Sequence, residues 1–377
     1  MENTVFGPEQ TLEIWIVLFG IISFAMWAET QTWGKKLGAV VIAIITGFVL
    51  GNIGFLPTTA PIYETIWTIV VPLAIPLLLF SANFKKIINE SGPTLLAFGI
   101  GAVATVVGAL AAFYIIALPE QAENLTGVFA ATFIGGGMNF AAVSQALGIS
   151  QDTLLLAAAA ADNIVTLLFL FFLAMIPAMA FFTKKYPGER ELKNADPAPK
   201  AQKSRALDYS QLVLALFISL LLVGLGNALQ IVSGWQGTAI LFTTLLALGL
   251  ANGAPVLMKT LENSFDLGMV LMLIFFATLG ASANVFALID TAPILFVFAI
   301  IVVVFHFVIL FGLGKVMKLT LPELITASNA CILGPATAAG LAASNGWKSL
   351  VTPGILVGTL GYAIANFIGV ALANFLG

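Results

Sequence analysis

The sequence predicts an all-α, polytopic membrane protein. It is expected to hold two inverted repeats, each with about five spanning helices and one broken or re-entrant helical element. The first observation is composition: the 377 residues are 60% hydrophobic and 9% charged, whereas soluble domains carry about 25% charged residues. The second is a series of apolar segments of membrane-crossing length. The third is that two of these segments are interrupted by glycine or proline at corresponding places in the two halves.

The composition also limits the function classes. A disordered chain needs low hydrophobicity and high net charge, but here 15 basic and 18 acidic residues give a net charge of −3. This balance indicates no nucleic-acid partner. The single cysteine, Cys331, and the single histidine, His306, exclude a disulfide framework and a cysteine or histidine metal cluster. We expect no cofactor, with a bound Na⁺ ion as the one candidate.

Twelve apolar segments are each about long enough to cross a hydrocarbon layer of about 30 Å as a helix. Glu2, Glu9 and Glu13 stand at the start of the first segment without any basic residue, so it is expected to be a span and not a removable signal peptide. The predicted segments are residues 11–29, 37–56, 64–82, 93–117, 125–147, 152–183, 209–233, 237–252, 266–287, 291–315, 322–344 and 349–376.

One stretch, residues 184–208, is soluble in character. It is rich in proline and charge and predicts a linker between an N-terminal repeat, 1–183, and a C-terminal repeat, 209–377. Similar motifs recur in the two halves at a nearly constant offset, which predicts an internal duplication of the kind common in transporters. The matched motifs are Ser81-Ala82-Asn83 with Ser282-Ala283-Asn284, Ser91-Gly92-Pro93 with Thr291-Ala292-Pro293, and Gly135–Asn139 with Gly334–Thr337.

Charge decides between parallel and inverted repeats. If all twelve segments cross, ten of the fifteen basic residues at best share one side. If the two broken segments each enter and leave from the same face, all fifteen share one side, as short cytoplasmic loops favour. We therefore expect five crossings per half and inverted repeats. The linker would be cytoplasmic and both termini would lie outside a multi-pass protein of the inner, cytoplasmic membrane.

The two breaks are the candidate substrate site. Backbone groups freed at mid-depth persist only inside protein or beside a watery cavity. Helix N-termini that converge from opposite faces would attract an anion, whereas the C-terminal carbonyls of the preceding limbs suit a cation. Alternatively, these glycines only permit close helix packing, which is the role expected of Gly47–Gly51 and Gly354–Gly358. The predicted substrate-binding residues are Gly135, Gly136, Gly137, Asn139, Gly334, Pro335 and Thr337.

Four stretches carry a family resemblance: residues 134–139, 158–163, 334–340 and 353–362. They resemble the YjcL-like family of uncharacterised bacterial membrane proteins, also described as domain of unknown function 819, and the resemblance covers nearly the whole chain. More distantly, the plan is similar to glutamate:sodium symporters, 2-hydroxycarboxylate transporters, bile-acid:sodium symporters and cation:proton antiporters. That kinship implies a core domain, mainly 125–183 with 322–377, that moves like an elevator against a scaffold. The one protein partner that we expect is a second copy of the chain, in a homodimer.

Asp162 is the main candidate for ion binding. It lies ten residues into the sixth segment, about 15 Å deep at 1.5 Å per residue, and ionisable residues at that depth generally mark an ion or proton site. With Asn163 it forms an acidic-plus-amide pair similar to that of cation:proton antiporters. Ser328 and Asn329 complete the predicted ion-binding set. The alternative is an Asp162 held by hydrogen bonds for structure only.

His306 lies mid-span and has no titratable partner near it in sequence. It is expected to be neutral and bonded to a backbone carbonyl, with proton relay as the alternative.

The leading hypothesis for the whole chain is a secondary active transporter of a small solute, an organic anion being one candidate, driven by Na⁺ or H⁺. The alternative is a cation:proton antiporter. An intramembrane enzyme and a channel rank lower, because no hydrolase or metalloprotease motif occurs. The expected partners are the substrate or ion and membrane lipids.

Overall fold

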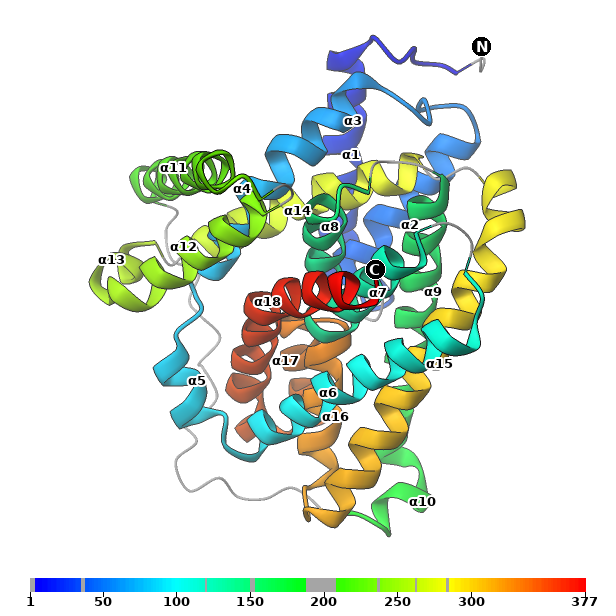
Figure 1. Ribbon diagram of the computed structural model, residues 1–377, viewed down its shortest axis with the longest axis vertical. Coiled ribbons are helices and arrows are strands. Elements are labelled where there is room, and N and C mark those ends of the chain that lie inside the picture. The colour runs from blue at the N-terminus through cyan, green and yellow to red at the C-terminus, as the bar shows by residue number, and fades with distance from the viewer. Residues whose placement is uncertain are drawn as a thin grey trace.

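A computed structural model of the chain describes residues 4–34, 38–118, 121–149, 153–187, 208–235, 238–261, 263–282 and 285–377. Within these ranges every regular element is a helix (Figure 1), as the sequence predicts. Eight described helices are long and apolar enough to cross a membrane, and two more apolar helices, α2 (Gly38–Asn52) and α12 (Ala239–Gly253), are shorter. The prediction of an all-α polytopic membrane protein is confirmed. Most of the predicted linker lies outside the described residues.

The N-terminal half contains eleven described helical elements in addition to α2, and the third span among them is continuous through a π-helical turn, η2. Their bounds are α1 Thr11–Thr30, α3 Pro61–Thr65, η2 Ile66–Val70, α4 Val71–Leu79, α5 Phe84–Glu90, α6 Gly92–Ile115, α7 Ala122–Gly135, α8 Gly137–Ala146, α9 Thr153–Met175, η3 Ile176–Ala178 and α10 Ala180–Thr183.

The C-terminal half repeats much of this order. Helices α2 and α12 both have 15 residues, and α8 and α17 both have 10. The remaining bounds are α11 Tyr209–Ser233, α13 Pro255–Thr260, α14 Ser264–Ser282, α15 Val285–Val316, α16 Leu321–Ile332, α17 Pro335–Ser344 and α18 Lys348–Leu376.

Contacts between the halves are reciprocal. Helix α2 packs against α14, and their counterparts α12 and α4 also pack together; α1 contacts α14 while α11 contacts α4. At the centre the equivalent helices α6 and α15 pack against each other, and there Thr105 Oγ1 lies 2.9 Å from His306 Nδ1, 201 residues away in sequence. A twofold relation between the repeats would produce such pairing. That this relation is an inversion across the membrane stays a prediction.

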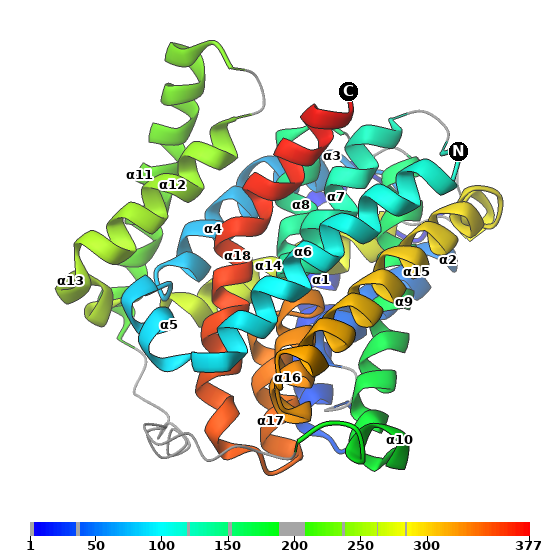
Figure 2. The same ribbon diagram turned by 60° about the horizontal axis from the view of Figure 1, so that its bottom comes forward.

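The packing also separates two groups of helices. Helices α7, α8, α16, α17 and α18 pack among themselves and with α6, while α15 packs against α6 and α9. Helices α1, α2, α4, α11, α12 and α14 pack mainly among themselves. The first group therefore contains the predicted core elements, α9 among them, together with α6 and α15. In Figure 2, α11 and α12 stand at one side of the molecule and α9 and α15 at the other, with α6 running between them.

Glycines let the helices of the second group approach closely. Gly47 and Gly51 of α2 lie against the backbone of α14 at Ala277 and Ala281, and Gly280 of α14 lies against the Ile44 carbonyl of α2. A side chain at any of these positions would meet backbone atoms, so the contact depends on its absence. This is the usual way in which membrane helices pack. The predicted packing role of Gly47 and Gly51 is confirmed.

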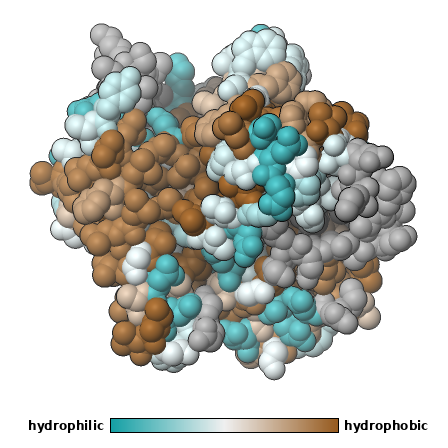
Figure 3. Space-filling model, turned by 90° about the horizontal axis from the view of Figure 1, so that it is seen from above, coloured by the Kyte–Doolittle hydropathy of each residue, from teal (hydrophilic) through white to brown (hydrophobic). Residues whose placement is uncertain are grey.

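Much of the surface is apolar. Helix α11 exposes Val213, Phe217, Leu220 and Leu221, and hydrophobic residues form a broad area of the face seen in Figure 3, with hydrophilic residues gathered in patches. Exposed hydrophobic areas of this extent are unusual on soluble monomers. They are expected where helices face lipid, because a helix satisfies its backbone polar groups internally.

The labelled ends of the chain lie toward one end of the molecule in Figure 2, and α10, which leads into residues 184–208, lies toward the other. The positions of Lys85, in α5, and Lys315, in α15, test the predicted topology, because both side chains are exposed. Five crossings per half would place them on the same side of the membrane. Twelve simple crossings would place them on opposite sides.

We expect single cysteines at Lys85 and Lys315, in a Cys331→Ser background, both to be protected from an impermeant thiol reagent in intact cells. Both should react after permeabilisation, because the positive-inside tendency places them in the cytoplasm. A cysteine at Glu123 should react in intact cells and serves as the control. Labelling of one lysine position but not the other in intact cells would contradict the inverted arrangement.

Candidate functional site

The first break separates α7 from α8 at Gly136, whose φ of 78° and ψ of 175° form a conformation that is almost confined to glycine. The two limbs fold back on each other. Ala131, before the break, and Val143, after it, both lie against Gly369 of α18. The element is therefore a helical hairpin and not an interrupted straight helix.

The second break repeats this geometry. Gly334, between α16 and α17, has φ 96° and ψ −173°, and Pro335 opens α17, where its missing N–H costs no helical hydrogen bond. Thr326 before the break and Ala338 after it both lie against Gly354 of α18. Gly358, farther along α18, lies against Pro335. The packing role predicted for Gly354 and Gly358 is confirmed, and it holds α18 on the second hairpin.

The two hairpin tips meet. A Cβ on Gly136 would stand 3.3 Å from the carbonyl oxygen of Leu333 and 3.5 Å from the amide nitrogen of Gly334. In Figures 1 and 2 the pair α7 and α8 and the pair α16 and α17 come from opposite ends of the molecule. Thr337 donates a 3.1 Å hydrogen bond to the Gly334 carbonyl. The structure thus brings together the tip residues that the sequence predicts as a substrate site.

Two buried carboxamides flank the tips. Asn139, in the first turn of α8, reaches back over Gly135, and Asn329 lies on the last turn of α16. Both side chains are fully buried, and neither amide oxygen nor amide nitrogen has a hydrogen-bond partner among the described residues. A buried polar group left unpaired costs about 1–3 kcal/mol. Protein atoms alone therefore leave both carboxamides unsatisfied.

Asp162 lies beside the first tip. Its side chain is 5% exposed and accepts hydrogen bonds of 3.3 Å from the hydroxyls of Thr132 and Thr166. Thr132 belongs to α7, and its carbonyl accepts the Gly136 N–H at 2.7 Å. The carboxylate is therefore linked through one residue to the break. Sequence reasoning missed both threonines, although Thr166, four residues along the same helix face, could have been found from its spacing.

The rest of the predicted ion-binding set is dispersed. Asn163, next to Asp162 on α9, donates to the Ala159 carbonyl at 2.7 Å and lines an apolar cavity of about 200 Å³ between α2, α9 and α14. Ser328 lies 3.0 Å from His306 Nε2. Neither residue hydrogen-bonds to Asp162 in the described structure. The acidic-plus-amide pair is adjacent in sequence but points in two directions.

His306 joins a buried polar network between the hairpins. Its Nδ1 lies 3.0 Å from the Gly101 carbonyl, as expected for a histidine bonded to backbone, and 2.9 Å from Thr105 Oγ1. Thr105 also donates to the Phe133 carbonyl of α7 at 3.3 Å. Because Ser328 lies on α16, the network connects the C-terminal ends of the first limbs of both hairpins.

Comparison with known proteins supports the resemblance seen in the motifs. A family model described as "Protein of unknown function (DUF819)" matches residues 16–377. The chain belongs to this family. It is 31% identical over 388 residues to a protein of Bacillus subtilis (strain 168) called "Uncharacterized membrane protein YjcL", with 96% of this chain and 97% of that protein covered. The prediction of the family is confirmed.

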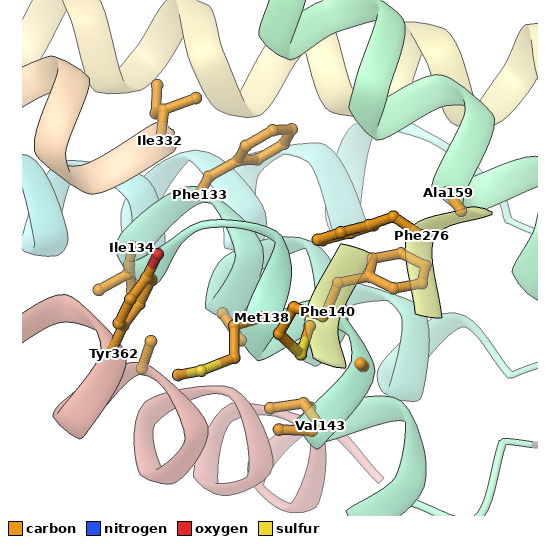
Figure 4. Packing of buried hydrophobic residues seen from close by; sticks show 14 of the residues in the cluster. Phe133, Ile134, Met138, Phe140, Val143, Ala159, Phe276, Ile332 and Tyr362 are labelled. Carbon is orange, nitrogen blue, oxygen red and sulfur yellow. The ribbon is translucent and has the colours of Figure 1, made fainter. Parts of the chain in front are cut away.

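In this DUF819 protein the last helix, α18, packs against the hairpins. Gly361 lies against the Ile134 carbonyl and Gly135, and Tyr362 places its hydroxyl near Gly334. The predicted duplication would place Gly361 or Tyr362 at the position equivalent to Asp162, which would make the site asymmetric. Apolar side chains close the space around the first tip, as Figure 4 shows for Phe133, Ile134, Met138, Phe140, Phe276 and Tyr362.

Proposed function

We propose that this DUF819 protein is a secondary active transporter that binds a small solute between the hairpin tips and a Na⁺ ion or a proton at Asp162. The strongest support is the meeting of two broken helices, one from each half, beside the unpaired carboxamides of Asn139 and Asn329. In membrane transporters, irregular backbone at depth serves to line a binding cavity.

The chemistry of the tips suits a polar solute. Two helix N-termini, those of α8 and α17, begin at the breaks and direct the positive ends of their dipoles there. The helices α7 and α16 end at the same breaks with the negative ends of theirs. Each carboxamide adds a hydrogen-bond acceptor and two donors. A solute with an anionic group, an organic anion among them, would find donors there, and a cation would find carbonyls.

Asp162 is the proposed coupling site. Within the described part of the chain, its hydrogen-bond partners are two hydroxyls, which stabilise the carboxylate but do not neutralise it. A buried charge without a counter-charge is costly, so a bound monovalent cation or a proton would stabilise this site. Its connection through Thr132 to the Gly136 amide would let ion binding favour one geometry of the tip.

The division of the helices into two groups supports movement of one against the other. We propose that the group holding both hairpins moves as the core of an elevator-like transporter, with the second group as scaffold. A cation:proton antiporter is the second candidate. It is favoured by the single carboxylate at Asp162, which would then bind the transported ion itself.

The test is a thermal-shift screen of organic anions, amines and amino acids on the purified protein, in sodium and in choline buffer. We expect sodium and at least one solute to raise the melting temperature, because a ligand that binds only the native state stabilises it. Asn139→Ala and Asn329→Ala should match the ligand-free stability of the parent or exceed it, because each removes an unpaired buried amide. Both should lose the solute-dependent shift.

The matched control is Asn345→Ala, at the end of α17, whose amide already donates to the Leu341 carbonyl at 2.9 Å. This variant should keep the parent's response to solute. An equal solute-dependent shift in the parent and in both tip variants would place the binding site elsewhere.

A further inference from the structure

A cavity of about 690 Å³ lies at the end of α8 that is farthest from the first tip. Glu64, Trp67 and Thr68 of the third span line it together with Gln145 of α8. Its volume is within the range of about 300–1,000 Å³ found for small-molecule sites. A single inorganic ion would fill only a small part of it. Under the predicted topology the cavity faces the outside of the cell.

The backbone beside this cavity is irregular for a reason that can be read from the sequence. Within the π-helical turn, the Val71 N–H bonds to the Ile66 carbonyl, five residues back. The donor at the same spacing from Trp67 would be residue 72, which is Pro72 and has no N–H. The Trp67 carbonyl instead accepts the side-chain amide of Gln145 at 3.2 Å. This bond fixes the orientation of the Gln145 side chain.

The polar groups of the cavity are mainly acceptors. With its Nε2 committed to Trp67, Gln145 has a buried Oε1 that lacks a partner among the described residues. The Thr68 hydroxyl donates to the Glu64 backbone carbonyl at 2.9 Å, so the hydroxyl oxygen of Thr68 can act only as an acceptor toward a solute. The Glu64 side chain is exposed and contributes a carboxylate, and the described residues that line the cavity include no lysine or arginine. Among the described residues, the cavity therefore carries one negative charge and no positive charge, and the Gln145 Oε1 beneath its surface lacks a donor.

A row of aromatic rings in contact with one another extends from this cavity toward the tip of the first hairpin. Trp67 meets Phe275 edge to face, with ring centroids 5.0 Å apart, and Phe275 is 5.1 Å from Phe276. The Phe276 ring lies against Gly137, the first residue of α8. Along α8, Gln145 is eight residues from Gly137, which corresponds to about 12 Å at 1.5 Å per residue.

We propose that this cavity is the outward entry site of the transporter and that it selects solutes carrying a protonated amine. The inference rests on the proposed transport function and adds a substrate class to it. An alkylammonium group donates up to three hydrogen bonds and carries the charge opposite to that of Glu64. A simple carboxylate would meet acceptors and a like charge. A solute with both groups could place its amine here on entry and later its carboxylate at the helix N-termini of the tips.

The charge selection can be measured without any transport. Thr68→Cys in a Cys331→Ser background places a thiol in the cavity, and its rates of reaction with trimethylammonium-ethyl and sulfonato-ethyl methanethiosulfonate are compared. The same ratio at Ser233→Cys, an exposed position at the end of α11, corrects for intrinsic reactivity. We expect at least about a fivefold preference for the cationic reagent at Thr68→Cys, because a unit charge a few ångströms away acts on the two reagents with opposite sign.

Adding Glu64→Gln should bring the corrected ratio close to one. A ratio at Thr68→Cys equal to that at Ser233→Cys, or one unaffected by Glu64→Gln, would overturn the proposal. Butylammonium chloride should slow labelling by a neutral thiol reagent, whereas sodium acetate should not. Slowing by sodium chloride but not by butylammonium would mark an inorganic-ion site and would also overturn it. Charge selection without any solute uptake would instead refute the transport function alone, so the two failures are distinguishable.

Discussion

Asp162→Asn is expected to abolish ion-driven uptake while leaving the protein folded. The amide matches the carboxylate in size and can still bond to the hydroxyls of Thr132 and Thr166, which lie 3.3 Å from the carboxylate oxygens. The charge is lost, and with it the ability to bind Na⁺ or exchange a proton. A neutral amide is cheaper to bury than a carboxylate. Uptake in proteoliposomes under sodium and proton gradients, with the sodium-dependent shift in melting temperature, measures the effect.

Asn163→Ala is the matched control. Its amide bonds within its own helix and lines the apolar side cavity, so uptake and the sodium-dependent shift should stay close to those of the parent. An antiporter would differ in one respect, because Asp162→Asn would abolish proton movement with no organic solute present. Undiminished sodium dependence in Asp162→Asn would remove this residue from the mechanism. The hairpin carbonyls and hydroxyls would then be the remaining candidates.

The spans and the breaks were predictable because each depends on local sequence. Apolar runs of about 20 residues have few alternatives to a membrane helix. The breaks were located correctly because the backbone there has φ of 78° at Gly136 and 96° at Gly334, which other residues rarely adopt. Hydropathy predicted the ends of the helices less accurately. The segment predicted over 37–56 ends as a helix at Asn52, since Gly54 turns the chain with φ 76° while the following residues are still apolar.

The partners of the site residues were not predictable, because they come from helices distant in sequence. Thr132 reaches Asp162 across 30 residues and Thr105 reaches His306 across 201. Adjacency in sequence predicted that Asp162 and Asn163 would act as a pair. Their side chains diverge because neighbouring residues on a helix point about 100° apart. The π-helical turn before Pro72 leaves hydropathy unchanged and so gave no signal in the apolar pattern, although it shapes the cavity lined by Gln145.

The tip glycines give the second large effect. Gly136→Ala and Gly334→Ala should each reduce uptake to background while leaving membrane insertion intact. Both residues have φ and ψ values that are strained for alanine by about 1–3 kcal/mol. The new methyl group would also press on the opposite side of the site. At Gly136 it would stand 3.3 Å from the Leu333 carbonyl, and at Gly334 it would stand 3.0 Å from the Tyr362 hydroxyl. Both substitutions would therefore push the tips or α18 away from the space proposed for the solute.

Gly346→Ala separates backbone strain from blockage of the tips. Gly346 also has a positive φ, 78°, but it follows the end of α17, and a Cβ there would meet no atom of the described residues within 4 Å. It should therefore lower the melting temperature without loss of uptake per folded molecule. Uptake is measured in proteoliposomes at matched protein content, with melting temperatures of all three variants. If the tip variants transport like Gly346→Ala, strain alone explains the glycines, and the meeting of the hairpins is a packing feature without a role in solute binding.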